Sequence, residues 1–278
     1  MKLYYENSRG KIIDLMNWPV VAQNPEVLAE RSWSYETEGN QDGTKNFKQF
    51  YKDVEQKQLQ LSVMADDRAS YNLLMDDMSE IFDYDIRNRQ PGKIWWNDRY
   101  KEAYVTASDL SDYEEDFEAI ESTITVSTTY PWWIKENRVE GHIGRQESTG
   151  NNLDYPHDYP FDYYNGIEDA QISNESISDC NFQLTIYGPC ENPRLIIGKH
   201  VYGLTCTLED GEYLVIKSRE KKAYKVKITG EQESVFQFRD GEYYLYEKLH
   251  PGIYRISWDG LFGFELTAYE ERSEPRWI

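Results

Sequence analysis

The sequence predicts a mainly β protein of two modules, with a single helix in the first module. Three observations predict this class. Short apolar runs alternate with polar residues in both halves, only one segment has a convincing helical period, and glycine-containing turns separate the runs. With 278 residues, 39% of them hydrophobic and 15% aromatic, the chain can build the cores of one large or two ordinary domains.

The first half opens with a predicted hairpin. Apolar runs at 3–5 and 11–15 flank Asn7-Ser8-Arg9-Gly10, where glycine is available for a positive φ angle. Further strands are predicted at 58–63 and 122–126, because every second residue there is apolar or β-branched. We expect each of these two strands to have one face in contact with water.

A helix is predicted between these two strands. It begins near Asp66 and Asp67, where a carboxylate can cap free backbone amides. Apolar side chains then recur at steps of three and four residues, at Tyr71, Leu74, Met75, Met78, Ile81 and Phe82. We expect this stripe to pack against the sheet of its own module, with a subunit contact as the alternative, and different faces can do both.

The segment 155–164 repeats tyrosine, proline and aspartate and separates the two β-rich halves. Two Tyr-Pro steps hold the backbone extended, so its rings are expected to cover a neighbouring surface. We interpret it as a packed domain joint, with Tyr155, Tyr159, Phe161 and Tyr163 as the candidate contacts. The predicted layout is a first domain at 1–140, a connecting segment at 141–170 and a second domain at 171–278.

The second half is predicted to be an antiparallel β-sandwich. Alternating residues indicate strands around 182–186 and 224–228, and further short strands are expected at 235–238, 243–246, 253–256 and 264–266. Asp210-Gly211, Asp240-Gly241 and Asp259-Gly260 lie between such runs, and Asp-Gly suits the positive φ angles of tight hairpins.

Charge and cysteine content exclude several classes of protein. Thirty basic and fifty acidic residues give a formal charge of -20, which removes the electrostatic attraction that nucleic-acid or membrane binding normally needs. The start has no apolar signal core, and no run reaches the length of a membrane span, so we expect a soluble protein made in a cytoplasm. Cys180, Cys190 and Cys206 are expected to be unpaired thiols.

No catalytic motif is recognisable. Phosphate-binding loops, nucleophile elbows, zinc-protease helices and Cys-x-x-Cys pairs are all missing, so we predict no enzyme and no cofactor. The four histidines, His142, His157, His200 and His250, are scattered singly and are interpreted as surface or core residues. The acidic cluster 109–116 lacks EF-hand spacing and is interpreted as a solvated loop rather than a calcium site.

Aromatic residues keep one alternative open. Tryptophan and tyrosine faces stack on sugar rings, and the candidates are Trp95, Trp96, Trp132, Trp133 and Trp258. Core or interface packing is the more frequent use of such residues. The alternative function is therefore a carbohydrate-binding adhesion module that recognises a bacterial surface glycan. A hydrolase with paired carboxylates is ranked below it, because no pair can be chosen among fifty acidic residues.

An ordered set of motifs resembles a known family. It comprises the Asn7–Gly10 turn, the 39–43 turn Gly-Asn-Gln-Asp-Gly, the acid-led helix, Tyr130-Pro131-Trp132-Trp133, the joint repeat, the Pro251-Gly252 turn and the closing segment 271–277. Over nearly its full length the chain resembles the distal tail proteins of long-tailed bacteriophages and their prophages.

The resemblance implies a structural protein of the phage tail tip or baseplate, located in the virion. It implies a homo-hexameric hub ring built from β-sandwich-like first domains, with galectin-like second domains outside. The partners would be the tail tube protein, a tail-associated hub or fibre protein and, as an additional candidate, a receptor-binding protein, with no direct contact to nucleic acid or membrane. Flexible tails, contractile tails and phage-derived bacteriocins all remain open.

Within that ring, the opening hairpin and the helix are our candidates for subunit contacts, because unpaired strand edges and apolar stripes favour association. The candidate interface residues are Tyr4, Ile12, Leu74, Met78, Arg87 and Arg89. The two arginines are included because six copies of an acidic chain repel one another and basic residues at the seams would offset that repulsion.

Overall fold

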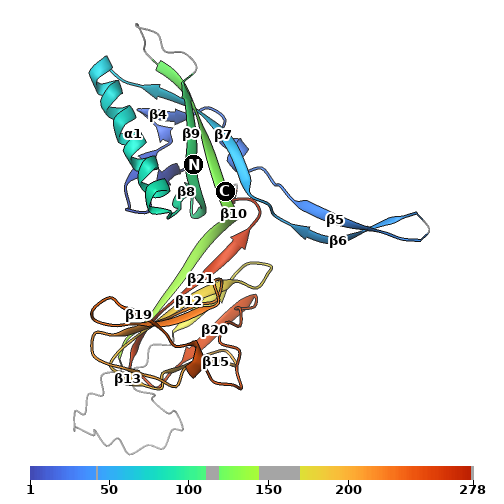
Figure 1. The fold of residues 1–278 in the computed structure, drawn as a ribbon, viewed down its shortest axis with the longest axis vertical. Helices are drawn as coiled ribbons and strands as arrows, with labels where there is room; N and C mark the ends of the chain where they lie inside the picture. The colour runs from blue at the N-terminus through green and yellow to red at the C-terminus, as the bar shows by residue number, and fades with distance from the viewer. Residues whose placement is uncertain (42, 111–118, 144–169, 277–278) are drawn as a thin grey trace, which may run out of the picture. The chain divides into compact units, whose positions relative to one another are not determined.

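The computed structural model describes residues 1–41, 43–110, 119–143 and 170–276, and these form two compact units (Figure 1). The first unit comprises Met1–Lys135 and Glu271–Ile278, and the second comprises Glu136–Glu270. The chain leaves the first unit in strand β10 (Ala119–Gly141) and returns to it in β21 (Gly263–Arg272). The predicted layout differs at both boundaries, since it ended the first domain at residue 140 and assigned residues after 270 to the second domain.

The first unit is built on an antiparallel sheet whose strand order is β2-β1-β8-β9-β10-β7-β4-β3. Its strands are β1 (Leu3–Glu6), β2 (Ile12–Asp14), β3 (Met16–Asn17), β4 (Val20–Ala22), β7 (Glu55–Met64), β8 (Gly92–Trp96) and β9 (Arg99–Leu110), together with β10. A short 3₁₀ helix, η1 (Pro25–Leu28), follows β4. The predicted opening hairpin is confirmed, because β1 pairs with β2 and Gly10 between them has φ +84°.

The alternation predicted for β7 and β10 sets the core face of this sheet. Leu59, Leu61 and Val63 of β7 are fully buried. In the antiparallel register Leu59 lies opposite Ile124 and Val63 opposite Ile120, so apolar side chains of the two strands share one face. The intervening polar residues point to the other face, as period two requires.

The predicted helix is confirmed as α1 (Arg68–Asn88). The Asp67 side chain accepts a hydrogen bond of 2.7 Å from the backbone N–H of Ser70 and caps the helix start. Arg89, in the left-handed region at φ 54°, ends it. The apolar stripe packs into the core of the first unit, which fits the expected contact with its own sheet.

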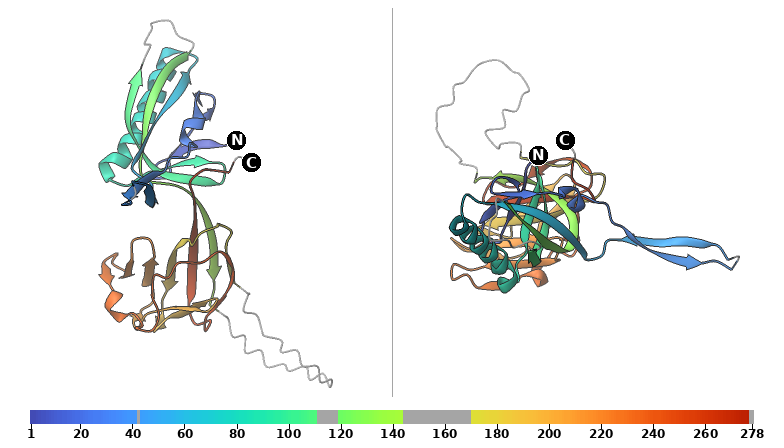
Figure 2. Two further views of the ribbon diagram at one scale, coloured as in Figure 1. Left: turned by 90° about the vertical axis from the view of Figure 1, so that its right-hand side faces the viewer. Right: turned by 90° about the horizontal axis from the view of Figure 1, so that it is seen from above.

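A separate two-stranded sheet was not predicted. Strands β5 (Ser34–Gly39) and β6 (Lys45–Tyr51) pair only with each other among the described residues, and the hairpin extends away from the rest of its unit (Figures 1 and 2). We call residues 34–51 the arm. The motif at 39–43 forms its tip, where Gly43 has φ +84°. All described residues of the arm are exposed except Ser34, which is half-buried.

The second unit has two antiparallel sheets around one core, which confirms the predicted sandwich. The larger sheet has the order β19-β18-β17-β12-β21-β10, and the smaller has the order β11-β20-β14-β15. Their strands are β11 (Gln171–Asn174), β12 (Asn181–Tyr187), β14 (Arg194–Ile197), β15 (His200–Gly203), β17 (Tyr213–Lys217), β18 (Lys222–Val226), β19 (Gln232–Ser234) and β20 (Gly252–Ser257). The short strands β13 (Cys190–Glu191) and β16 (Thr207–Leu208) form a third pair.

Two predicted strands of the second unit were wrong. Residues 235–238 contain a 3₁₀ helix, η2 (Phe236–Phe238), and residues 243–246 form no strand. Leu245 and Tyr246 are consecutive and both buried, which a strand with one wet face does not allow. Phe236 stacks on Tyr246 with ring centroids 5.7 Å apart, so these aromatic residues cover the core instead of pairing in a sheet.

The predicted Asp-Gly hairpin turns are only partly confirmed. Gly211 and Gly260 do adopt positive φ angles, of 78° and 75°. They join strands of different sheets, β16 to β17 and β20 to β21, and so close no tight hairpin. Lys221, at φ 52°, and Gly230, at φ 83°, occupy the turns between β17, β18 and β19. Cys180, Cys190 and Cys206 form no disulfide bond with one another.

Candidate assembly surface

The predicted interface residues occupy different environments. Ile12 is exposed on β2, whereas Tyr4 is half-buried and stacks on Trp95 at a centroid distance of 5.7 Å. On the helix, Leu74 packs partly against the core, and Met78 is only 3% exposed within it. The side chain of Met78 therefore serves the core of its own unit.

Arg87 and Arg89 lie exposed at the carboxyl end of α1. Arg87 pairs with Asp83 at 3.2 Å, one helical turn earlier, an exposed pair of small energetic value. The structure brings Leu74 and Met78 together on one helix face but does not join them to Tyr4 or Ile12 in one surface patch. Their interface role stays a prediction. The joint residues Tyr155, Tyr159, Phe161 and Tyr163 lie outside the described residues.

The arm carries an exposed aromatic cluster that sequence analysis missed. Tyr35, Phe47 and Phe50 are 57%, 61% and 58% exposed, yet their rings contact one another. The centroid of Phe47 lies 5.0 Å from that of Tyr35 and 5.1 Å from that of Phe50. Three large rings thus share one side of a thin hairpin, with water on their outer faces.

A β-bulge explains why the alternation did not reveal this cluster. Glu36 lies opposite Gln49 but Thr37 lies opposite Phe47, so Lys48 is an extra residue in β6. Phe47 and Phe50 are three residues apart and would point to opposite faces of a regular strand. The extra residue returns them to the same face. The signal available in the sequence was the 39–43 turn flanked by aromatic residues.

Both ends of the arm are attached to strand β9 through a buried ion pair. Lys101 Nζ lies 2.7 Å from Glu55 Oε2, and both side chains are almost fully buried. Glu55 also accepts a short hydrogen bond from the Ser32 hydroxyl, which precedes β5. Lys101 further donates to the backbone oxygen of Leu28 at 3.3 Å and lies 4.9 Å from the Trp133 ring centroid. The chain is therefore held where it enters and leaves the arm.

A second cluster lies beside this ion pair. Lys52 Nζ donates to the backbone oxygen of Pro131 at 2.9 Å and lies over the rings of Trp132 and Trp33, at 5.2 and 5.8 Å. Trp33 and Trp132 also meet edge to face at 5.5 Å. The Tyr-Pro-Trp-Trp motif at 130–133 thus contributes to the base of the arm.

At the base of the arm, the pKa values of the ionisable side chains follow from their burial and from the ion pair between Lys101 and Glu55. Burial alone would raise the pKa of Glu55, but the charge and hydrogen bond of Lys101 outweigh it and lower that pKa. Burial lowers the pKa of Lys101, an effect that Glu55 opposes. Burial likewise lowers the pKa of Lys52. A buried pair of this kind costs desolvation energy but fixes the geometry of the groups that it joins.

The closing segment reaches the same region. Arg31 Nε lies 2.5 Å from Glu274 Oε1, and Tyr130 donates a hydrogen bond to the Glu271 carboxylate. Glu271 and Glu274 of the closing segment are thereby joined to Tyr130 and Arg31 beside the arm. The arm, its aromatic cluster and its base form the candidate assembly surface.

An isolated two-stranded hairpin is only marginally stable in water, and exposed aromatic clusters mark interaction sites. Aromatic residues are enriched at protein interfaces, and both edges of the arm have free pairing positions among the described residues. The arrangement suits contact with another protein chain.

The tryptophans considered for sugar stacking are occupied in the structure. Trp96 and Trp133 are buried in the core of the first unit. Trp95, Trp132 and Trp258 are half-buried and each contacts another aromatic ring. None of the five presents a free, fully exposed face.

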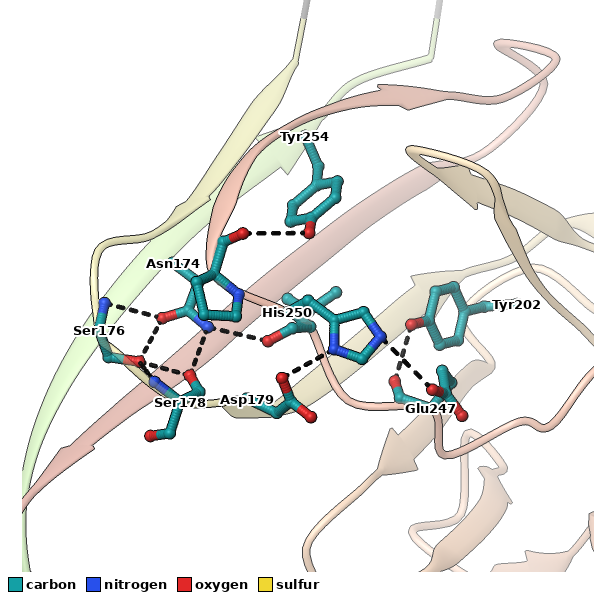
Figure 3. Close-up of polar contacts among 10 residues, drawn as sticks. Asn174, Ser176, Ser178, Asp179, Tyr202, Glu247, His250 and Tyr254 are labelled. Atoms are coloured by element: carbon teal, nitrogen blue, oxygen red, sulfur yellow. Dashed lines mark hydrogen bonds and ion pairs between the residues drawn. The ribbon is translucent and has the colours of Figure 1, made fainter.

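His250 lies between two carboxylates, those of Asp179 and Glu247 (Figure 3). Its Nδ1 lies 2.7 Å from Asp179 and its Nε2 lies 3.7 Å from Glu247. The hydrogen bond that His250 Nδ1 donates to the Asp179 carboxylate raises the pKa of His250. In the described part of the chain, no group of three or more metal-ligating side chains converges and no helix is long and apolar enough to cross a membrane.

Comparisons with known proteins address the fold. No family model and no curated protein match the chain. A chain of the phage p2 baseplate in its activated conformation with Ca is 14% identical, the match covers 99% of both chains, and the TM-score is 0.61. The same baseplate with Sr gives 14% identity, 99% coverage of both chains and a TM-score of 0.59.

The SPP1 Dit protein, whose structure is described as a paradigm of the hub adsorption apparatus in phages that infect Gram-positive bacteria, is 7% identical. The match covers 98% of both chains at a TM-score of 0.55. At these identities the comparisons show the fold. From end to end, the chain has the fold found in these phage baseplate and Dit hub structures.

Proposed function

We propose that this protein is a structural distal tail protein that assembles into a hexameric hub ring at the tip of a phage tail. The ring would join the tail tube to the tail-tip or baseplate components, namely a hub or fibre protein and a receptor-binding protein. The protein would be made in the cytoplasm of the bacterial host and act in the virion, without catalytic activity of its own.

The arm is the observation that carries this proposal. It presents three aromatic rings to solvent on a hairpin that is fixed at both ends by Lys101 and Glu55. A monomer gains nothing from holding such a surface rigidly in water, whereas a neighbouring subunit would bury it and pair with its edges. Contacts of one subunit's arm with a different surface of the next are heterologous, and heterologous contacts form a ring where the rotation between subunits closes.

The full-length fold match supports the same role, because the similar chains belong to phage baseplate and hub structures and are covered by 98% or more. The formal charge of -20 supports a protein scaffold over a nucleic-acid binder. Subunit repulsion between acidic copies implies that the ring forms more readily as ionic strength rises, because salt screens exposed charges.

The test is the mass and symmetry of the purified protein by light scattering and negative-stain microscopy, over a range of protein and salt concentrations. The proposal expects six-fold rings with an open centre, together with a mass that increases with protein concentration. A chain that remains monomeric at every concentration, also when mixed with a tail tube protein, would contradict the hub role. Catalytic turnover of a substrate would contradict the structural role.

A further inference from the structure

The larger sheet of the second unit has an outer face that is not used by the core. Leu184, Ile186, Leu214 and Ile216 point into the core and are fully buried. Because strand side chains alternate, Thr185, Val215 and Val226 point to the opposite face. The register confirms that they are neighbours, since Thr185 lies opposite Val215, and Tyr213 lies opposite Val226.

These three outward residues form the floor of a cleft. Thr185, Val215 and Val226 are only 7%, 5% and 6% exposed although they face away from the core. Larger side chains on adjacent strands cover them, and the cleft that remains has a volume of about 360 Å³. That volume lies in the range of small-molecule sites.

Three tyrosines from three consecutive strands line the cleft. Tyr187 is on β12, Tyr213 on β17 and Tyr224 on β18, and the Tyr187 and Tyr213 ring centroids lie 6.2 Å apart. Tyr213 and Tyr187 are directly opposite in the ladder, and Tyr224 lies opposite Val215. The rings therefore form a row of apolar faces across the sheet.

Polar side chains of several kinds surround this row. Gln183, Gln232 and Lys217 supply amide and ammonium groups, and Glu265 supplies a carboxylate. Glu265 is held in place by Arg138 at 2.7 Å and lies 3.4 Å from the Tyr187 hydroxyl. The cleft thus offers hydrogen-bond donors and acceptors beside aromatic faces, without a strong excess of either charge.

We propose that this cleft, which we call the tyrosine cleft, binds a saccharide of one or a few pyranose rings. A sugar ring has an apolar C–H face that stacks on tyrosine and a rim of hydroxyl groups that need both donors and acceptors. The tyrosine cleft supplies both. The inference goes beyond the proposed hub function and does not depend on it.

A protein partner fits the tyrosine cleft less well. Protein docking is driven by apolar anchors that enter fully desolvated pockets. Here the apolar floor is already covered, so an inserted side chain would bury little additional apolar area. What remains accessible are ring faces and polar groups, the surface that a polyhydroxylated ligand can use.

The test is binding of the labelled full-length protein to an array of neutral and charged bacterial and mammalian glycans, followed by ligand-observed NMR with the strongest glycan. Tyr213→Ala and Tyr224→Ala each remove a stacking face, and each should weaken binding by roughly tenfold or more. Tyr187→Phe keeps the ring and removes only the hydroxyl, so it should weaken binding less.

Tyr243→Ala is the matched control, because Tyr243 is also an exposed tyrosine of the second unit but is not part of the cleft. It should leave binding unchanged, and thermal unfolding should confirm that every variant is folded. Binding to none of the glycans would overturn the proposal. So would binding that the cleft variants do not weaken, or saturation of the tyrosine cleft by a tail protein instead of a glycan. Ring assembly is measured separately, so failure here leaves the hub proposal intact.

Discussion

The Tyr5 hydroxyl donates a hydrogen bond of 2.5 Å to Oδ2 of Asp85 and so joins the first strand of the chain to the helix. Asp85 is fully buried, and its other carboxylate oxygen accepts hydrogen bonds from the backbone N–H and the hydroxyl of Ser8, at 2.7 and 2.6 Å. Burial raises the pKa of Tyr5, and Asp85 adds to that increase. The predicted hairpin turn is therefore held by a carboxylate on the helix.

Asp85→Ala should destabilise the first unit by about 3 kcal/mol, because three donors would lose their acceptor in a buried site. Chemical denaturation followed by tryptophan fluorescence measures this change. Asp83→Ala is the control, since Asp83 is exposed on the same helix and its removal should change the free energy of unfolding by less than about 0.5 kcal/mol. Equal effects of the two variants would refute the role assigned to Asp85.

Gly92 leaves the space that the hydrogen bond between Tyr5 and Asp85 occupies. A Cβ at this position would overlap the Tyr5 hydroxyl oxygen and lie 2.5 Å from Asp85 Oδ2. Gly92→Ala should therefore break the Tyr5–Asp85 hydrogen bond and destabilise the protein by about 1–3 kcal/mol. Gly241→Ala is the control, because a Cβ there meets no atom within 4 Å. A Gly92 variant with wild-type thermal stability would show that Tyr5 and Asp85 can rearrange without loss of stability.

The ion pair at the base of the arm predicts that substitutions of Lys101 and Glu55 have coupled effects on the free energy of unfolding. Lys101→Met leaves Glu55 charged and buried and should cost about 3–5 kcal/mol, whereas adding Glu55→Gln should recover part of that loss. Lys57→Met removes the more exposed pair with Glu30 and should cost no more than about 1 kcal/mol. Additive effects of the first two substitutions in urea denaturation would argue against direct coupling.

The lowered pKa of Glu55 adds a pH dependence. A carboxylate with a depressed pKa in the folded state stabilises the protein above its unfolded pKa, and this contribution is lost as the pH falls through the folded value. The wild type should therefore lose stability below the ordinary glutamate range more steeply than the double variant. Parallel stability curves for the two proteins between pH 6 and pH 3 would contradict this assignment.

The aromatic cluster of the arm should serve assembly rather than folding. Replacing Phe47 and Phe50 by serine should change the free energy of unfolding by less than about 1 kcal/mol, because both rings are exposed, but should reduce the assembled mass in light scattering. Leu261→Ser removes a comparably exposed apolar residue from the second unit, outside the arm and α1, and should assemble normally. If the arm variant forms the same particles as the wild type, the arm is not a subunit contact.

His250 provides a pH-dependent contact in the second unit. Its pKa is raised by the Asp179 hydrogen bond, so the stability that it contributes is fully present below the ordinary histidine value of about 6.5 and is lost as the pH rises through the folded value. NMR titration should show a lower His250 pKa in Asp179→Asn. Asp210→Asn, an exposed carboxylate outside this contact, should leave it unchanged. An unaltered His250 pKa in Asp179→Asn would exclude the contact.

Local signals in the sequence were sufficient for the opening hairpin, for β7, for part of β10 and for α1 of the first unit. The alternation at Leu59, Leu61 and Val63 predicts β7 because burial of one sheet face imposes period two. Asp66 and Asp67 predict the start of α1 because a carboxylate there can cap free backbone N–H groups, and in the structure Asp67 does so. The turn before Gly10 was predicted on the same local basis.

Local signals failed where aromatic residues had two possible environments. Residues 235–238 and 243–246 have strand-like composition, but their rings pack over the core of the second unit instead of entering a ladder. The arm was missed because the bulge at Lys48 breaks the alternation of β6. The tyrosine cleft was missed because its members come from five strands that only the register brings together.

The sequence by itself determined the mainly β class, the single capped helix and the division into two β-rich halves, because each depends on periodicities and caps within a few residues. The tertiary structure alone decided that residues after 270 return to the first unit. It also decided that the Lys101–Glu55 pair holds both ends of the arm and that Asp85 accepts hydrogen bonds from Tyr5 and Ser8. These contacts join residues about 20 to 240 positions apart, and which partner a buried polar group finds depends on strand order and register rather than on its neighbours in the chain.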